Sequence, residues 1–226
     1  MYNMKKERSY WEGTHAANRR IMYLAAGYEQ EDIVKKPHIG IANTFFEGSP
    51  GTGHLRSLAE SVKKGIWMNG GMPMEFGVPA TCGNIATGSD GLRYELVLRD
   101  IVAMSIEAVV RVHKLDGLVI LASCDNVIAG AYLAALRVHI PCIVVTGGIM
   151  GAGSYCGQAL VQADVDVAAI RGDSELLDIV QEHVCPSFGA CPSMGTACTM
   201  QILGEALNLV LPGTSTIPAA DNLKLR

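Results

Sequence analysis

The sequence predicts an α/β fold with a mostly parallel sheet flanked by helices. Amphipathic helical segments alternate with short apolar runs along the chain, and the most apolar run, residues 117–122, is typical of a buried central strand. The length of 226 residues suits one sizeable domain. We therefore expect a single α/β domain over residues 1–226, with a helical N-terminal arm over 1–36 and an α/β core over 37–226.

Periodicity places the individual elements. Strands are expected at the short apolar runs, which are residues 38–43, 74–80, 117–122 and 142–146. Helices are expected where apolar residues recur every three or four positions, at residues 19–27, 54–68, 94–113, 129–139, 158–169, 175–182 and 196–209. One face of the helix over 94–113 should be buried, and it carries Leu98, Ile101, Val102, Ser105, Ala108, Val109 and Val112.

Composition argues against several classes of protein. A net charge of −4 with scattered Lys and Arg does not suit a nucleic-acid binder. The longest apolar stretch, residues 140–150, is about half of the ~20 residues that a membrane span needs. Residues 1–13 lack the apolar centre of a signal peptide. We therefore expect a cytoplasmic protein whose seven cysteines are reduced. The hydrophobic content of 49% indicates extensive burial, including burial against another chain.

Small, polar or Gly-rich loops follow the expected strands, at residues 43–51, 81–84, 123–126 and 147–151. In parallel sheets ligands bind beyond the carboxyl ends of the strands, so we expect these loops to carry the chemistry. Cys124 and Asp125 could ligate a metal there, or they could be a buried thiol and a helix-capping carboxylate. The loop over residues 48–53 could hold an anion with backbone amides beside His54, but a tight turn is the simpler interpretation.

A further group of cysteines, Cys185, Cys191 and Cys198, lies at intervals of six and seven residues, which is not the spacing of a closed zinc site. Cys191 follows a Gly-rich loop just before a helix, where the helix dipole would favour a thiolate. The alternative is that all three are small core residues.

Several segments, in order along the chain, carry a shared resemblance. Residues 88–96 (GSDGLRYEL) match the pattern GHEGMRYSL, residues 116–126 (DGLVILASCDN) match DGLVxLxGCDK, and residues 189–200 (GACPSMGTACTM) match GxCGGMYTANTM. Residues 36–44 and 211–219 match a characteristic opening strand and an LPGSAAIPA segment. Together these segments resemble the amino-terminal part of the dihydroxy-acid and sugar-acid (phosphogluconate) dehydratase family, over nearly the whole chain.

The resemblance implies an α/β amino-terminal domain that is followed in the family by a carboxyl-terminal β-barrel domain, usually within a dimer. The chain stops at Arg226, well short of a full-length member, so we expect the barrel to be absent. The implied chemistry is that of a hydro-lyase, which removes water from a 2,3-dihydroxy acid to give a 2-keto acid, as in branched-chain amino acid biosynthesis. The family holds an iron–sulfur cluster with three cysteines and a nearby Mg²⁺ with oxygen ligands.

Several positions depart from the family pattern. Cys124 and Cys191 match two of the cluster cysteines, but Gly51 stands in place of the third. Asp125 matches a metal ligand, whereas Gly83 replaces a ligating Asp and Asn126 replaces a Lys that ligates when carbamylated. The family's remaining Glu ligand and catalytic Ser base belong to its later part, so the resemblance assigns no catalytic residue in this chain.

The departures leave the cofactors and the function open. Cys82 could join Cys124 and Cys191 in a rearranged three-thiolate site, or the chain could hold no cluster and no Mg²⁺. The leading hypothesis is one part of a split or heteromeric hydro-lyase, with a separate chain carrying the missing domain. The alternatives are a non-catalytic relative that binds a small acid or a partner chain, and a thiol- or metal-handling protein. We expect a small hydroxy-acid ligand and a homo- or hetero-oligomer, without nucleic acid or membrane.

Overall fold

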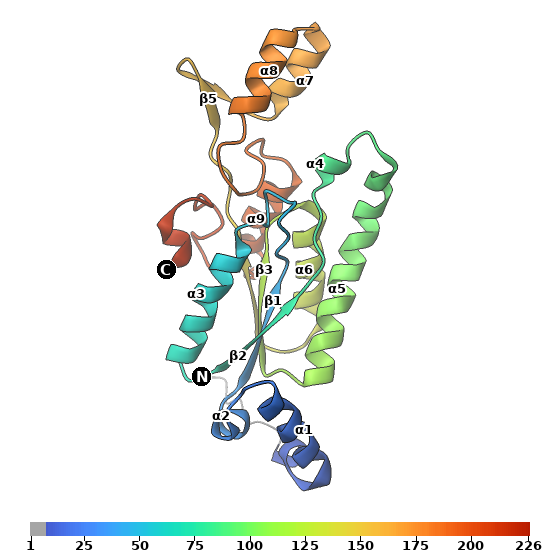
Figure 1. Ribbon diagram of the computed structural model, residues 1–226, viewed down its shortest axis with the longest axis vertical. Helices are drawn as coiled ribbons and strands as arrows, with labels where there is room; N and C mark the ends of the chain where they lie inside the picture. The colour runs from blue at the N-terminus through green and yellow to red at the C-terminus, as the bar shows by residue number, and fades with distance from the viewer. Residues whose placement is uncertain (1–7) are drawn as a thin grey trace.

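The computed structural model describes residues 8–226 and shows an α/β fold built on a four-stranded parallel sheet (Figure 1). The strands lie in the order β2-β1-β3-β4, so β1 and β3 are central. Their bounds are β1 His38–Asn43, β2 Met72–Gly77, β3 Gly117–Ala122 and β4 Cys142–Thr146. All neighbouring pairs are parallel, and therefore the carboxyl ends of all four strands lie at one edge.

Helices cover both faces of this sheet. The helices longer than one turn are α1 Gly13–Ala25, α2 Gln30–Lys35, α3 Leu55–Met68, α5 Tyr94–His113, α6 Asp125–Arg137, α7 Ala163–Arg171, α8 Ser174–His183 and α9 Thr196–Ala206. Shorter turns are η1 Arg8–Trp11, α4 Gly83–Ala86, η2 Asp90–Arg93 and η3 Asn222–Leu225. Within residues 8–226, no helix is long and apolar enough to cross a membrane.

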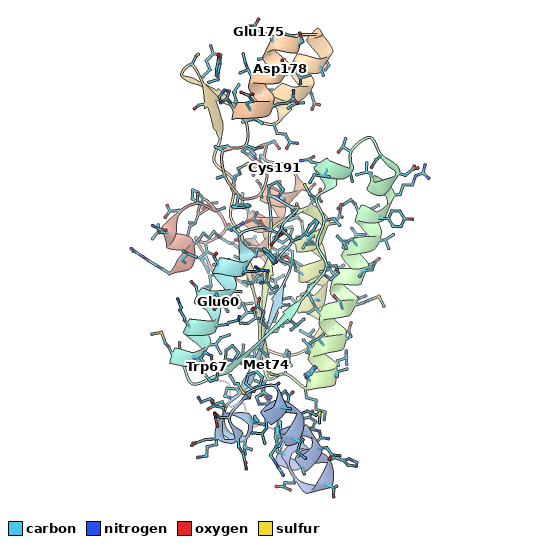
Figure 2. All side chains as sticks on the ribbon, viewed as in Figure 1. Glu60, Trp67, Met74, Glu175, Asp178 and Cys191 are labelled. Atoms are coloured by element: carbon cyan, nitrogen blue, oxygen red, sulfur yellow. The ribbon has the colours of Figure 1, made fainter. Side chains whose placement is uncertain are left out.

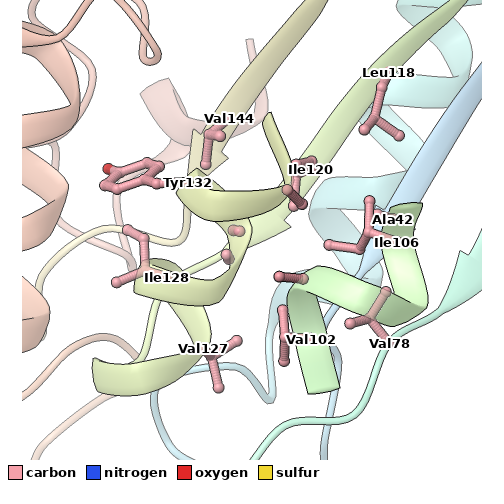
Figure 3. Close-up of a cluster of buried hydrophobic side chains, with 14 of the residues drawn as sticks. Ala42, Val78, Val102, Ile106, Leu118, Ile120, Val127, Ile128, Tyr132 and Val144 are labelled. Carbon is pink, nitrogen blue, oxygen red and sulfur yellow. The ribbon is translucent and has the colours of Figure 1, made fainter. Parts of the chain in front are cut away.

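The larger core lies between the sheet and the helices α5 and α6. Side chains alternate along β3, so Leu118 and Ile120 face these two helices (Figure 3), while Leu121 faces α3 on the opposite side. Ile120 is fully buried and packs with residues such as Val102 and Ile128. Full burial of one such side chain contributes roughly 1.5–3 kcal/mol. This two-sided burial explains why β3 is apolar throughout.

The N-terminal helices close the end of the sheet that lies away from the loops after the strands. Trp11, Ile33 and Met72 form a small buried cluster there, and His38 bonds through Nε2 to the carbonyl oxygen of Ile33 at 3.0 Å. The arm predicted over residues 1–36 is helical from Arg8 onward as far as the structure describes it, and residues 1–7 lie outside the described part.

A distal arm, residues 153–183, projects beyond the carboxyl ends of the strands (Figure 1). It contains the antiparallel hairpin of β5 Gly153–Tyr155 and β6 Gln158–Leu160, followed by α7 and α8. Its own small core includes Leu160, Val180 and Val184. The helix predicted over residues 158–169 is therefore wrong at its start. Cys156 and Gly157 both have positive φ values, 48° and 79°, which suit a two-residue hairpin turn.

Other boundaries also differ from the predictions. The second strand begins at Met72 rather than residue 74, because Met72 pairs with His38 in register. The helix predicted over 129–139 begins at Asp125, directly after Cys124, so these loop residues are in fact at a helix start. On α5, Leu98 and Val102 are buried as predicted, but Ile101, Ala108 and Val112 are exposed, and the other buried residues are Glu95, Ala103, Ile106 and Val110. The packed face is thus rotated from the one that hydropathy alone predicts.

Candidate functional site

The loops after β1, β3 and β4 meet at the carboxyl edge of the sheet, as the parallel topology requires. A Cβ atom placed on Gly51 would lie 3.2 Å from the Sγ atom of Cys124, so the loop after β1 is in contact with the loop after β3. His54 bonds through Nε2 to the carbonyl oxygen of Gly147 at 2.8 Å, which ties the β1 loop to the β4 loop. Burial lowers the pKa of His54, which indicates a neutral, structural imidazole.

The loop over residues 48–53 is a tight turn. The amides of Thr52 and Gly53 both donate to the carbonyl oxygen of Ser49, at 3.1 and 2.8 Å. These donors are therefore satisfied within the loop and do not point to a bound anion. The helix that follows, α3, has His54 at its N-cap position and no side-chain cap.

A pocket of about 320 Å³ opens beside this edge. It is bounded by the start of α6, the short helix α4, the start of α5, the base of the distal arm and the loop before α9. Figure 2 places Cys191 at the level where the distal arm meets the sheet domain. The side chains that matter most in the wall are those of Cys82, Asn84, Glu95, Cys124, Asp125, Asn126 and Cys191.

Two of the thiols, those of Cys82 and Cys124, interact directly. A hydrogen bond from the Cys124 thiol lowers the pKa of Cys82 to about 6, and the backbone amides of Ile85 and Asn84 act in the same direction against the effect of burial. The same hydrogen bond raises the pKa of Cys124, as does its burial. Cys82 is thus the thiolate of the pair and Cys124 the proton donor.

The third thiol, that of Cys191, comes from the loop before α9. The backbone of Ala190 forms a bridge to Ile149 after β4, which brings this loop to the edge of the sheet. Asn84 donates from Nδ2 to the Sγ atom of Cys191 at 3.2 Å. Burial raises the pKa of Cys191, and the nearby charge of Cys82 raises it further. The three predicted cluster cysteines therefore lie in one pocket although they are far apart in the sequence.

The other two cysteines of that group differ in their burial. Cys198 is buried and donates from Sγ to the carbonyl oxygen of Cys191 at 3.0 Å, so it supports the loop rather than lining the pocket. Cys185 is exposed and lines an adjacent pocket together with Cys82, Cys124 and Cys191. The reading of all three as core residues is therefore correct only for Cys198.

Two carboxylates, those of Asp125 and Glu95, lie on another wall of the same pocket. Asp125 is at the start of α6. Burial raises its pKa, and the nearby charge of Glu95 raises it further. Glu95 is only 6% exposed, in the first turn of α5. It accepts hydrogen bonds from Thr81 Oγ1 at 2.5 Å and from Asn126 Nδ2 at 3.4 Å. The N-cap position of α6 is Cys124 rather than Asp125, and Asp125 lines the pocket.

Glu95 is a site residue that sequence reasoning missed. Its position corresponds to the Ser of the GHEGMRYSL pattern, and a charged residue in an otherwise apolar helix face was the available signal. Within residues 8–226, no three His, Cys, Asp or Glu side chains lie close enough together to hold one metal ion by themselves. A divalent ion at this wall would thus need amide, hydroxyl or water oxygens beside the two carboxylates.

Comparison with known proteins gives a consistent result. The sequence profile of the dihydroxy-acid/6-phosphogluconate dehydratase N-terminal family matches residues 36–226. The chain is 40% identical over 220 residues to a dihydroxy-acid dehydratase of Methanococcus maripaludis and 40% identical over 220 residues to one of Halothermothrix orenii, each covering 95% of this chain and 40% of the relative. A dihydroxy-acid dehydratase of Desulfitobacterium hafniense is 41% identical over 94% of this chain and 38% of its own length.

Proposed function

Because the chain belongs to the dihydroxy-acid/6-phosphogluconate dehydratase family, we propose that it is one part of a two-part hydro-lyase. The reaction is loss of water from a 2,3-dihydroxy acid: a base removes the C2 proton, the C3 hydroxyl leaves, and the enol product tautomerises to a 2-keto acid. The chain spans about 40% of the length of the curated relatives it matches. In this proposal a second chain supplies the rest of the site.

One observation carries this proposal: Cys82, Cys124, Cys191 and Asp125 all line the same pocket at the carboxyl edge of the sheet. A site that had merely drifted would have no reason to keep soft thiols and a hard carboxylate converging from separate loops. Such a combination suits a thiolate-bound cluster beside a divalent cation, because thiolates prefer iron and carboxylates prefer Mg²⁺.

The thiol set fits an iron–sulfur cluster if Cys82 takes the role that Gly51 cannot. The Cβ of a side chain at position 51 would be in contact with the Sγ atom of Cys124, which supports position 51 as a former ligand position. Cys82 interacts with the same thiol, and this hydrogen bond lowers the pKa of Cys82, which favours its ligating thiolate form. We therefore assign Cys82, Cys124 and Cys191 as the residues that would hold the cluster.

Such a cluster would supply a Lewis acid for the leaving hydroxyl. The residues of this chain would position the substrate around it. Asp125 and its neighbours would orient the substrate carboxylate through a divalent cation, and Asn84, which bonds to both Cys191 and Gln162, would hold the thiol loop against the base of the distal arm. The proton-abstracting base is expected from the missing part of the site.

The test is anaerobic reconstitution of this protein with iron and sulfide, with and without the carboxyl-terminal part of the Methanococcus maripaludis dehydratase as a second chain. Formation of 2-keto acid from a panel of 2,3-dihydroxy acids is then measured. We expect turnover only in the mixture, and none with Asp125→Asn. A stable complex that contains the cluster but never turns over any dihydroxy acid would overturn the proposal.

A second function is favoured by the replaced ligands. Gly51, Gly83 and Asn126 stand at three positions where the family pattern has ligands, which suits a non-catalytic relative that binds a small acid or a full-length dehydratase. Absence of iron and sulfide after anaerobic purification, together with binding of a hydroxy acid by calorimetry, would support this function. Stoichiometric zinc without iron would support a metal-handling role instead.

We also propose that the chain pairs with a second copy of itself through α5. Tyr94, Val97, Ile101 and Met104 are exposed along α5 at alternating spacings of three and four residues. This spacing is that of a helix-pairing seam, and a seam on one helix is complementary to the same seam on an identical helix in a twofold dimer. We place the protein in the cytoplasm, where its cysteines, all of them unpaired, would remain reduced.

A further inference from the structure

Glu95 is a charged side chain in a place that its local sequence does not explain. It is 6% exposed, although it lies in the first turn of a helix whose buried residues are otherwise apolar. Burial of a carboxylate is unfavourable unless it is hydrogen-bonded and compensated by positive charge. Glu95 has hydrogen bonds from Thr81 and Asn126, but its charged neighbour in the pocket is another carboxylate, that of Asp125.

The Glu95 carboxylate lies next to Gly83, where the absence of a side chain leaves space. A Cβ atom on Gly83 would lie 3.8 Å from Glu95 Oε2 and 3.9 Å from Asp125 Oδ2. A carboxylate carried on residue 83, as the family pattern has it, would therefore project to the place where the Glu95 carboxylate now lies. Glu95 itself stands where that pattern has Ser. The loss of one carboxylate and the gain of the other thus fall at the same point in space, although they are separated by twelve residues in sequence.

We propose that Glu95 replaces the lost ligand at position 83 and that Glu95 and Asp125 together bind a divalent cation of the Mg²⁺ class. This assignment deepens the proposed function, since the cation is the one that the family's chemistry requires. Mg²⁺ in proteins is commonly held by one or two carboxylates and keeps several waters, so two carboxylates are a sufficient protein contribution. Thr81 and Asn126 hold the Glu95 carboxylate in position.

The carboxylates and the thiols of this pocket also prefer different classes of metal. Carboxylate oxygens prefer hard cations, whereas the thiols of Cys82, Cys124 and Cys191 prefer softer metals. Asp125 directly follows Cys124 in the chain, so the two kinds of ligand meet where β3 ends and α6 begins. The site therefore offers adjacent places for a thiolate-bound group and an oxygen-bound cation, with Glu95 completing the second.

The test measures cation binding by the whole chain, with no substrate and no second chain present. Mn²⁺ serves as the probe, because its bound and free forms are distinguished by electron paramagnetic resonance, and Mg²⁺ is used as the competitor. We expect one Mn²⁺ per chain, displaced by Mg²⁺. Glu95→Gln keeps the shape of the side chain but removes its charge and one of its two acceptor oxygens, and it should weaken binding about tenfold or more, comparable to the effect of altering groups that support metal ligands. Glu107→Gln, farther along α5, is the matched control and should bind as the unaltered protein does.

A double variant that moves the carboxylate from residue 95 to residue 83 tests whether the two positions are equivalent for cation binding. Glu95→Ser together with Gly83→Asp moves the carboxylate back to the family position, and the Cβ of residue 83 has only ordinary van der Waals contacts there. We expect this double variant to recover binding that Glu95→Ser alone loses, which also shows that the loss is not a folding defect. Unchanged Mn²⁺ affinity in Glu95→Gln, or no Mn²⁺ binding by the unaltered chain, would overturn the inference. Mn²⁺ binding that depends on Glu95 but is never accompanied by dehydration would leave it intact and would count against the proposed function alone.

Discussion

At the scale of single residues, local hydrogen bonds and burial set the protonation of the three cysteines in the pocket. Cys82 lies at the start of α4, where the Cys124 thiol and two backbone amides stabilise its thiolate, whereas burial favours the neutral thiols of Cys124 and Cys191. One pocket thus favours a thiolate at Cys82 and neutral thiols at Cys124 and Cys191. Sequence spacing could place these residues at strand ends but could not assign their charges, because the charges depend on hydrogen bonds between separate loops.

The Cys82 thiolate should be detectable by its reactivity. Its pKa of about 6 leaves it mainly ionised at pH 6.5, whereas partial burial of the sulfur and the nearby charge of Cys82 raise the pKa of Cys185 and keep that thiol neutral. In the metal-free protein, iodoacetamide at pH 6.5 should modify Cys82 roughly fivefold faster than Cys185, allowing for the weaker nucleophilicity of a low-pKa thiolate. Peptide mass spectrometry gives both rates. Cys124→Ala removes the hydrogen-bond donor and should slow the Cys82 reaction; equal rates at the two sites would contradict the assignment.

The proposed ligand role of Cys82 is tested by moving its thiol to position 51. Cys82→Ser should lose the bound iron and sulfide that anaerobic reconstitution gives, because only two thiols then remain in the pocket. Adding Gly51→Cys should restore them, since a Cβ at position 51 lies 3.2 Å from Cys124 Sγ and needs a shift of only a few tenths of an ångström. Iron and sulfide analysis with the visible absorption spectrum is the measurement. Cys156→Ser, on the exposed turn of the β5–β6 hairpin, is the control; iron retained by Cys82→Ser would exclude Cys82 as a ligand.

At the scale of elements, the packing of α5 against α6 positions both carboxylates of the proposed cation site, since Glu95 lies in the first turn of α5 and Asp125 is the first residue of α6. The two helices approach closely because Gly130 has no side chain. A Cβ there would lie 2.6 Å from the carbonyl oxygen of Arg99 and 2.8 Å from the Cβ of Val102. Hydropathy predicted both helices, but it placed the packed face of α5 wrongly, because it cannot detect where a neighbouring helix backbone comes within contact distance.

The contact at Gly130 predicts opposite effects for two similar substitutions. Gly130→Ala should destabilise the fold by roughly 1–3 kcal/mol, because the added methyl group overpacks the helix contact. Gly65→Ala, within α3, meets open space and should stabilise the fold by roughly 0.5–1 kcal/mol through helix propensity. Urea unfolding followed by circular dichroism measures both free energies. A Gly130→Ala protein as stable as the unaltered one would mean that α5 and α6 are farther apart than described.

At the scale of the whole molecule, the exposed apolar seam on α5 predicts a dimer in solution. Tyr94 and Met104 are 72% and 63% exposed, which is unfavourable unless another surface covers them. Val97→Glu with Met104→Glu should convert the dimer to a monomer, since it places charges in the seam. Light scattering after size-exclusion chromatography measures the mass. Leu136→Glu, at an exposed apolar position on α6, is the control and should leave the dimer intact. A monomeric unaltered protein, or a double variant that stays dimeric, would contradict this assembly.

The sequence by itself determined the fold class, the strands β1, β3 and β4, the helix α5 and the family, because apolar periodicity and contiguous motifs are local properties of the chain. It also identified Cys82, Cys124, Cys191 and Asp125 as site candidates. Only the tertiary structure showed that these residues share one pocket and that Glu95 lies beside the empty position of Gly83. Residues 83 and 95 belong to different elements, and the proximity of their side chains depends on how α4 and α5 pack against the strand ends, which no periodicity or spacing encodes.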